Sequence, residues 1–451
     1  MPRTNRRLLI GLLIGIVGVA FQAFGVLTAM QAAMQELRGM KYYAWAFSAF
    51  LIGMVVAIVT AGRITDRHGP AKPLTAGFTL FTVGLIGCML SPNVAIMLAG
   101  RFLQGLGSGA MNLALFVLVA QLFGERQRSQ LMAVLAFLWV LPAFLGPPAA
   151  GWIASNFGWR WVFGITLIPV AVCAVTAMSP LWKLERIEPE AQPQPVPFWA
   201  GLVLGLAVAA LQVAGQAAGQ QHHLLALLSG AIGVGGLAWV VPIIMPRGFF
   251  VAAAGLPAVI WVRALQSGTF FAAEPFLPLM LTQQRGFSLA GAGLILTVGS
   301  IGWTVGSAVQ SQTWFRLRRD QIIMLGAVAA ALGLGMITIY AWLPDVWFSV
   351  AVVGWILTGF GMGLSQASTS LAVMGLSEVH EQGRNTSSLQ VAEGMGSALL
   401  TGLAGTLFSF FHQAPHQAGF VATFGALALL CVLAFWLSSR VGVIANAVAG
   451  R

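Results

Sequence analysis

The chain has 451 residues, of which 58% are hydrophobic and only 8% are charged, with a net charge of +11. In soluble domains about a quarter of the residues are charged, so this composition excludes a soluble enzyme. In lipid, only helices and closed barrels satisfy every backbone hydrogen bond. The apolar runs have helical length and lack the alternation of a barrel. We therefore predict an all-α polytopic membrane protein.

Fourteen apolar runs are long enough to span a bilayer, which requires about 20 residues. We predict an N-terminal six-helix bundle over 1–182, a cytoplasmic linker over 183–197, two inserted transmembrane helices over 198–252 and a C-terminal six-helix bundle over 253–451. The linker is polar and rich in proline. The predicted spans are 8–30, 43–62, 73–91, 94–122, 128–154, 159–182, 198–219, 223–245, 253–282, 288–311, 321–343, 346–375, 386–411 and 417–439.

The distribution of Lys and Arg predicts the orientation of these spans. If the N-terminus is cytoplasmic, seventeen of the 23 basic residues fall in cytoplasmic loops or termini and four in outside loops. Basic loops favour the cytoplasmic side, so we expect a multi-pass protein of the inner membrane with both termini cytoplasmic. The basic residues are scattered over many short loops and form no single face. We therefore expect no binding of nucleic acid.

The first sequence motif lies after the second span and contains Gly62, Asp66, Arg67 and Gly69, in the order Gly-x-x-x-Asp-Arg-x-Gly. Glycine permits a tight turn. An Asp beside a helix terminus, next to an Arg, can form a charged clamp against a neighbouring helix end. We predict that this loop holds one gating state closed. A turn that is basic only because it faces the cytoplasm is the alternative.

The fourth span carries Arg101 and Gln104, followed by glycines at 105, 107 and 109. A charge inside a membrane is costly and indicates a functional site by default. We predict that Arg101 and Gln104 contribute to proton coupling or substrate binding. An arginine that extends to the outer interface is the alternative.

The glycine run at 105–109 recurs at 359–363, an offset of 254 that also relates Gly151 to Gly405. Transporters are commonly built from repeated halves, so this offset predicts two related bundles with an inserted pair of helices between them. Glycine-rich helix packing without a repeat is the alternative.

The fifth span contains Gly146-Pro147 and, three residues after Pro148, Gly151. Proline removes a backbone donor and bends a helix, so we predict a bend at this position, where the two halves meet. The segment 158–163 that follows contains two tryptophans, which suit a membrane interface.

Together these motifs resemble the major facilitator superfamily, specifically its drug:proton antiporters, and the span number resembles its fourteen-span branch. The resemblance covers nearly the whole chain. It implies a gating role for the loop at 62–69 and a role in proton transfer, or in its coupling, for Arg101. The motif with Gly146, Pro147 and Gly151 is found in exporters and is largely missing from importers, which implies export.

The chain departs from this family in its first span. The fourteen-span branch commonly has an acidic residue there, and by our alignment this chain has Gln22. An amide can hold a substrate by hydrogen bonds, but it cannot exchange a proton. Proton coupling must then depend on the two carboxyl groups predicted inside spans, Glu274 and Glu393. Uniport or a different driving ion is the alternative.

Glu274 is followed by Pro275 and Pro278 in the ninth span, and Glu393 lies near Gln390 in the thirteenth. A carboxyl group removed from water can bind and release protons near neutral pH. The prolines predict a broken helix, as at transporter binding sites. Arg263 precedes Glu274 by three turns, about 16 Å along the helix, and we expect both to line one cavity. An ion pair that orients helices, or a carboxylate that extends to the interface, is the alternative.

We therefore predict a secondary active transporter, not an enzyme, that exports small amphiphilic or cationic compounds by proton antiport through alternating access. A dedicated exporter of one native metabolite, lipid or siderophore is the second hypothesis, and a non-transporting sensor or scaffold is the third. The sequence contains no nucleotide-binding fingerprint. His412 and His416 have a spacing that could bind a metal on a helix, but they lie in a loop with Pro415, so we expect no cofactor and no metal. The expected partners are substrate, protons and the lipid bilayer, and the expected state is a monomer.

Overall fold

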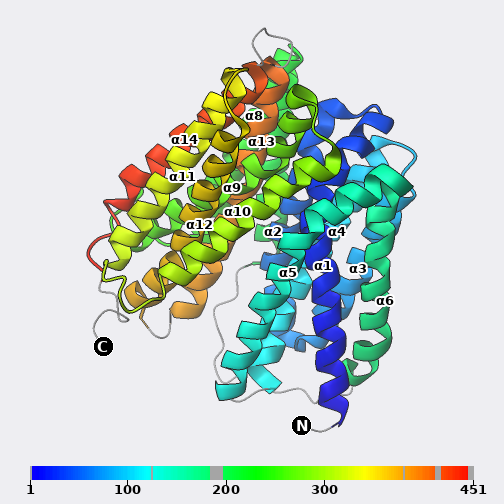
Figure 1. The fold of residues 1–451 in the computed structure, drawn as a ribbon. Helices are drawn as coiled ribbons and strands as arrows, with labels where there is room; N and C mark the ends of the chain where they lie inside the picture. Colours follow the sequence, from blue (N-terminus) through cyan, green and yellow to red (C-terminus); the bar gives the residue numbers. More distant parts are fainter. Residues whose placement is uncertain (1–2, 123–124, 183–196, 379–380, 412–417, 445–451) are drawn as a thin grey trace. The chain divides into compact units, whose positions relative to one another are not determined.

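The computed structural model describes residues 3–122, 125–182, 197–378, 381–411 and 418–444, so that all of the predicted linker except Pro197 lies outside it. The described part contains fourteen α-helices and no β-strand (Figure 1), which confirms the all-α prediction. The helices are α1 (Arg3–Glu36), α2 (Tyr43–His68), α3 (Ala71–Met89), α4 (Val94–Leu122), α5 (Glu125–Phe157), α6 (Arg160–Trp182), α7 (Phe198–Gly219), α8 (His223–Ile244), α9 (Leu256–Arg285), α10 (Leu289–Val309), α11 (Arg319–Trp342), α12 (Phe348–Leu376), α13 (Gln382–Phe411) and α14 (Ala418–Ser438), with 3-10 segments η1 (Met40–Tyr42) and η2 (Phe249–Val251).

Thirteen of these described helices are long and apolar enough to cross a membrane, and α9 is the exception. A helix that faces lipid must be apolar on that side, whereas a helix surrounded by protein can carry polar side chains. Most residues of α9 are buried, and the helix packs against α12, α13 and α14. Its weak hydropathy therefore reflects its position inside the bundle, where it carries Arg263 and Glu274.

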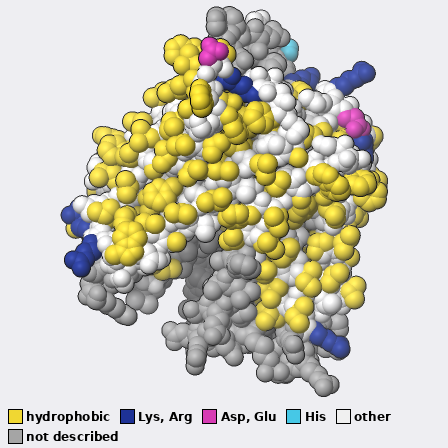
Figure 2. Space-filling view, viewed as in Figure 1, with side chains coloured by type: hydrophobic (Ala, Val, Ile, Leu, Met, Phe, Trp, Pro, Cys, Tyr) yellow, Lys and Arg dark blue, Asp and Glu magenta, His cyan; other side chains and the backbone are white. Residues whose placement is uncertain are grey.

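The outer surface has the composition of a membrane protein. Figure 2 shows hydrophobic side chains over most of the described surface in that view, with Lys and Arg at its margins. Large apolar side chains such as Val175, Leu206 and Leu429 are more than two-thirds exposed. Such exposure is unfavourable in water and favourable against acyl chains.

The chain forms two compact units. The first comprises residues 1–205 and 286–294, and the second comprises 206–285 and 295–451. Inside the first unit α1 packs against α5 and α6, and α4 packs against α2 and α3. Inside the second unit α9 packs against α13 and α14, and α12 packs against α11. The helices eight positions apart in order therefore have equivalent neighbours, as a repeated fold requires. The domain boundaries proposed from the sequence remain a prediction.

The two glycine runs have the same packing role in their own units. A Cβ at Gly105 would lie 2.0 Å from the carbonyl oxygen of Phe50 in α2, and one at Gly359 would lie 2.1 Å from that of Gly299 in α10. The runs at 105–109 and 359–363 each press alternate glycines against two neighbouring helices, α2 and α3 in one case and α10 and α11 in the other.

The register of these contacts is also repeated. Gly107 meets Gly77 and Gly361 meets Gly326, while Gly109 meets Met54 and Gly363 meets Trp303. The residues contacted in the two units are related by one offset, since Gly326 follows Gly77 by 249 residues and Trp303 follows Met54 by 249 residues. Close backbone packing, which we considered as the alternative to a repeat, therefore occurs together with a repeated arrangement, and the two explanations are compatible.

The inserted helices α7 and α8 pack on each other and on α13 of the second unit. Gly233 of α8 faces Leu211 of α7, and Gln212 Nε2 donates to the carbonyl oxygen of Ala398 in α13 at 2.9 Å. Ser388 Oγ donates to the carbonyl oxygen of Ile244 at 2.7 Å, which attaches the end of α8 to α13. The start of α7, in the first unit, places Gly201 and Gly205 against α2.

The structure corrects one expectation about proline. We predicted a break in the ninth span, but α9 is continuous through Pro275 and Pro278, and α5 is likewise continuous through its three prolines. The break is unnecessary because each proline removes only one hydrogen bond. In α9 the carbonyl groups that lose their backbone donor, four residues earlier, are those of Phe271 and Glu274.

The glycine contacts predict a sharp difference between two substitutions in the second unit. Gly359→Ala should lower the free energy of unfolding by about 1–3 kcal/mol because its Cβ would overlap the α10 backbone. Gly335→Ala in α11 is the control, since nothing lies within 4 Å of that position. Thermal unfolding of the purified variants checks this. Equal melting temperatures for the two variants would contradict the packing role.

Candidate functional site

Arg101 is buried in the first unit, where it is only 2% exposed. Its Nε donates to the carbonyl oxygen of Ala46 in α2 at 2.9 Å, and its Nη1 donates to Gln104 Oε1 at 2.6 Å. The guanidinium lies 4.6 Å from the ring centroid of Phe50, within cation–π range. Arg101 forms no ion pair with a described carboxylate. The side chain therefore points towards α2 and does not extend to a solvent interface.

Two glutamines of the first unit leave a buried donor without a partner. Gln22 Oε1 accepts a hydrogen bond from Thr166 Oγ1 of α6 at 2.9 Å, but Gln22 Nε2 has no partner among the described residues. Gln104 Nε2 is in the same state. A buried donor without an acceptor costs about 1–3 kcal/mol, so both amides are suited to a ligand or water that accepts hydrogen bonds.

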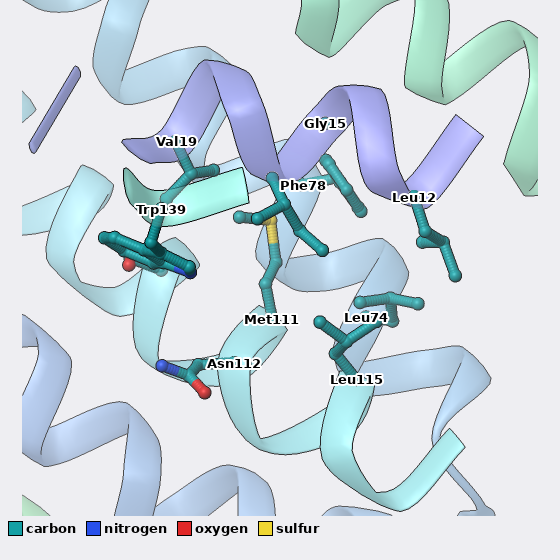
Figure 3. Close-up of a pocket in the computed structure, with 11 residues that line it drawn as sticks. Leu12, Gly15, Val19, Leu74, Phe78, Met111, Asn112, Leu115 and Trp139 are labelled. Atoms are coloured by element: carbon teal, nitrogen blue, oxygen red, sulfur yellow. The ribbon is translucent and has the colours of Figure 1, made fainter. Parts of the chain in front are cut away.

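A cavity of about 100 Å³ lies inside the first unit (Figure 3). Leu12, Leu74 and Leu115 lie at one end of it, Val19 and Trp139 lie at the other, and Phe78 and Met111 lie between them. The other lining residues are Gly15, Ile16, Ser108 and Asn112, so no charged side chain lines the cavity. An apolar cavity of about 150 Å³ can hold benzene, so this one is suited to an apolar group of at most one ring.

The Gly-Pro motif of α5 lies against α1 and the start of α10. Thr28 Oγ1 of α1 donates to the carbonyl oxygen of Pro147 at 3.1 Å. A Cβ at Gly151 would lie 2.7 Å from Ala290 Cα, and one at Gly293 would lie 2.8 Å from the Pro147 carbonyl oxygen. The motif therefore allows α5 to approach α1 and α10 closely. A Cβ at Gly146, in contrast, would lie 3.4 Å from its nearest neighbour, at ordinary contact distance.

The Gly-x-x-x-Asp-Arg-x-Gly motif occupies the end of α2, which reaches His68, and a two-residue turn before α3. Gly69 has φ +76, a conformation that favours glycine, so Gly69 makes the turn. Gly62 lies inside α2 near Leu113 and is not part of the turn. The side chains of Asp66 and Arg67 lie outside the described part of the structure, so the clamp stays a prediction.

The segment after the fifth span joins α6 to the end of α1. Glu36 accepts hydrogen bonds from Trp159 Nε1 at 2.7 Å and from Arg160 Nη1, and Arg160 also contacts the carbonyl oxygen of Ser91. Gly158 has φ +93 and makes the turn that presents both side chains. Of the two tryptophans predicted to face the interface, Trp159 is instead buried and bound to a carboxylate, whereas Trp161 is exposed.

In the second unit, Arg263 pairs with Glu393. The Nε of Arg263 in α9 lies 3.0 Å from Glu393 Oε2 in α13, and the side chains are 6% and 19% exposed. Arg263 also donates to Thr369 Oγ1 at 2.6 Å and to Ser370 Oγ at 3.2 Å in α12. The second carboxylate oxygen, Oε1, accepts from Gln366 Nε2 at 3.0 Å. This network joins three helices and satisfies both charges, while Gln390, one turn away, is exposed.

Glu274 is separate from this network. It is 8% exposed, and it makes no ion pair and no hydrogen bond through its carboxylate to any described residue. Protein typically buries a carboxylate only with a compensating partner, because removing the charge from water is costly. Among the described residues, the carboxylate of Glu274 therefore has no partner that compensates its charge.

An aromatic cluster surrounds the turn of α9 before Glu274. Phe270 stacks on Trp355 of α12 with centroids 4.9 Å apart and meets Trp303 of α10 edge-on at 5.3 Å. Phe271 lies 6.2 Å from the same Trp303. Phe270 and Phe271 precede Glu274 by four and three residues, so they lie one turn away on the same side of the helix.

A family model described as the Major Facilitator Superfamily matches residues 12–343 and 259–443. The chain belongs to the Major Facilitator Superfamily. Its fourteen described helices agree with the branch that carries two inserted helices.

Relatives within this superfamily are distant. The chain is 28% identical over 433 residues to an uncharacterized MFS-type transporter of Mycobacterium tuberculosis, covering 91% of this chain and 61% of that relative's length. It is 24% identical over 454 residues to a probable multidrug-efflux transporter of the same organism, covering 96% and 92%. A crystal structure of a peptide transporter POT in complex with sulfate superposes with a TM-score of 0.71 at 16% identity, covering 96% and 94%.

Several residues of the transporter's sites were not singled out from its sequence. Gln366, Thr369 and Ser370 are spaced by three and four residues, which places them on one face of α12. They lie in a polar segment, 365–370, of a mainly apolar helix, and this segment could have identified them. Thr28 and Trp355 give no comparable signal, because hydroxyl and indole groups are common in spanning helices and their partners are distant in sequence.

The Arg263–Glu393 pair predicts a specific pattern of stability in this transporter. Arg263→Gln and Glu393→Gln should each destabilise the protein by about 3–5 kcal/mol because each leaves one buried charge without its partner. The double variant should be more stable than the sum of the single effects implies, by about 0.5–3 kcal/mol. Thermal unfolding of all four proteins checks this, and strictly additive effects would show that the pair is not coupled.

Proposed function

We propose that this transporter exports amphiphilic cations in exchange for protons and that Glu274 binds the cation or the proton in turn. The observation that carries the proposal is the burial of Glu274 without an ionic partner among the described residues. A proton neutralises the carboxylate, and a cationic substrate compensates its charge. Because one carboxylate cannot hold both, binding of either ligand releases the other, which is the requirement for exchange.

Glu393 is the less suitable carboxylate for this role. Its charge is matched by Arg263 at 3.0 Å, and both of its oxygens accept hydrogen bonds. Protonating Glu393 would leave the guanidinium of Arg263 buried without a counter-charge, which is costly. We assign this pair the role of holding α9, α12 and α13 in register.

The surroundings of Glu274 favour a substrate with an aromatic or cationic group. The faces of Phe271 and Trp303 attract a positive charge, and Trp provides the strongest such contact. The apolar cavity of the first unit is a separate place for one uncharged ring. Gln22, Gln104 and Arg101 supply polar groups in that unit, and we propose that they contribute to substrate binding or coupling.

The direction of transport is supported by the α5 motif and by the relatives named as multidrug-efflux transporters. We propose outward transport from a cytoplasm that contains both termini, with Asp66 and Arg67 gating that side and a monomer as the working unit. A dedicated exporter of one native metabolite, lipid or siderophore is the second candidate, favoured by the small volume of the cavity. A scaffold would not require a buried carboxylate without a partner.

Glu274→Gln should abolish proton-driven transport. Purified protein is reconstituted into vesicles, a pH gradient is imposed, and uptake of ethidium or tetraphenylphosphonium is measured. The wild type should accumulate the cation and dissipate the gradient, whereas the amide variant can neither exchange a proton nor compensate a positive charge. Cation binding to the wild type should weaken as pH falls, because the proton competes for the carboxylate, and this dependence should vanish in the variant.

Asp345→Asn is the matched control, since this carboxylate is exposed in the connection between α11 and α12. It should retain full transport. Gradient-driven uptake by Glu274→Gln at the wild-type rate would disprove the assignment of Glu274. Failure of the wild type to move any cation of a broad panel, together with uptake of one neutral or anionic metabolite, would favour the dedicated exporter.

The cavity in the first unit generates a further expectation. Trp139→Ala should raise the KM for substrates with a bulky ring about tenfold and change KM for small cations little, because the indole lines one end of the cavity. Concentration-dependent uptake in the same vesicles measures both constants. Equal effects on large and small substrates would show that the cavity does not hold the ring.

A further inference from the structure

The connection between α8 and α9 presents apolar side chains away from the protein. In η2 the ring of Phe249 is buried and stacks on Trp261 of α9, with centroids 4.9 Å apart and planes 11° apart. Trp261 Nε1 donates to the carbonyl oxygen of Phe249 at 2.6 Å. This anchoring leaves the next two side chains outside, where Phe250 is 58% and Val251 is 71% exposed.

The end of α14 is attached to the same connection. Gly255 N donates to the carbonyl oxygen of Arg440 at 2.9 Å, and Arg440 Nη1 approaches the carbonyl oxygen of Val251 at 3.4 Å. The guanidinium of Arg440 also lies 5.7 Å from the ring centroid of Trp436, which is itself 57% exposed. Two arginines and three apolar side chains thus share one end of the second unit. We call Arg247, Phe250, Val251, Trp436 and Arg440 the Phe250 patch.

The charge of the Phe250 patch is positive and uncompensated. Arg247 is exposed and forms no hydrogen bond or ion pair with any described residue. The stretches 244–256 and 436–444 contain no acidic residue. Asp320, which accepts a hydrogen bond from the backbone of Ile444 at 3.2 Å, is already paired with Arg318 at 2.7 Å. Neither arginine of the patch therefore forms an ion pair with a described carboxylate.

We propose that the Phe250 patch binds an anionic phospholipid of the surrounding leaflet. The patch lies where α8 and α14 end and α9 begins. The ends of spanning helices lie at the level of the headgroups, where tryptophan and arginine are favourable. Guanidinium groups bind phosphate in a planar, two-bond geometry. A free phosphate would use the arginines alone, whereas a phospholipid also places its acyl chains against Phe250, Val251 and Trp436. Bound lipid would stabilise the start of α9 through the contact of Phe249 with Trp261. Trp261 lies two residues before Arg263.

Native mass spectrometry of the delipidated full-length protein tests this proposal. Phosphatidylglycerol and phosphatidylcholine with identical acyl chains are added, and the dissociation constant of each is measured. In the Arg247→Gln, Arg440→Gln double variant, the affinity for phosphatidylglycerol should fall about tenfold and that for phosphatidylcholine should stay unchanged. The single variant Arg247→Gln, which removes no hydrogen bond or ion pair with a described residue, should lose part of this affinity without a change in melting temperature.

The Arg316→Gln, Arg384→Gln double variant is the matched control, since it removes two exposed charges from the same unit. It should keep the wild-type affinity. An equal loss in both double variants, or no loss in either, would overturn the site. Free glycerol phosphate that competes as well as phosphatidylglycerol would show an anion site and not a lipid site. In Phe250→Ser, Val251→Ser, lipid affinity should fall while the response to glycerol phosphate is unchanged.

Discussion

The hydrocarbon core of a bilayer offers no hydrogen-bond partner, so the backbone polar groups of a spanning helix must be satisfied by the protein itself. The backbones meet this constraint by forming helices. They then pack through surfaces small enough for one backbone to touch another, as in the contacts of Gly105 with α2 and Gly359 with α10. Without a hydrophobic drive between helices in lipid, such close packing is a main source of association.

The same constraint governs the charges. Arg101 is held by a carbonyl oxygen, an amide and an aromatic ring, while Arg263 is held by Glu393 and the hydroxyl groups of α12. These arrangements are complete, so they stabilise one geometry. Glu274 is buried in α9 without a described partner for its charge, and a proton or a cation could compensate that charge. The difference between satisfied and unsatisfied charges separates the structural groups of the second unit from its proposed functional group.

A third consequence concerns the ends of the helices, where the constraint is relaxed. At that level polar and apolar groups can occur together, and arginine and tryptophan are both favourable. Glu36 with Trp159 and Arg160 shows one such arrangement, in which the charges are paired within the protein. The Phe250 patch shows the other, in which two arginines have no carboxylate and the lipid would supply the anion.

Composition and the length of apolar runs are local properties, so the amino-acid sequence alone predicts the helical architecture in a bilayer. It also located the repeat, the Gly-Pro motif and the buried charges at Arg101, Arg263, Glu274 and Glu393. The partners of those charges, in contrast, follow from how the helices pack. Arg263 lies on the same helix as Glu274, yet its partner is Glu393, 130 residues away. Sequence spacing fixes neighbours within one helix, whereas ion pairs between helices depend on how those helices pack.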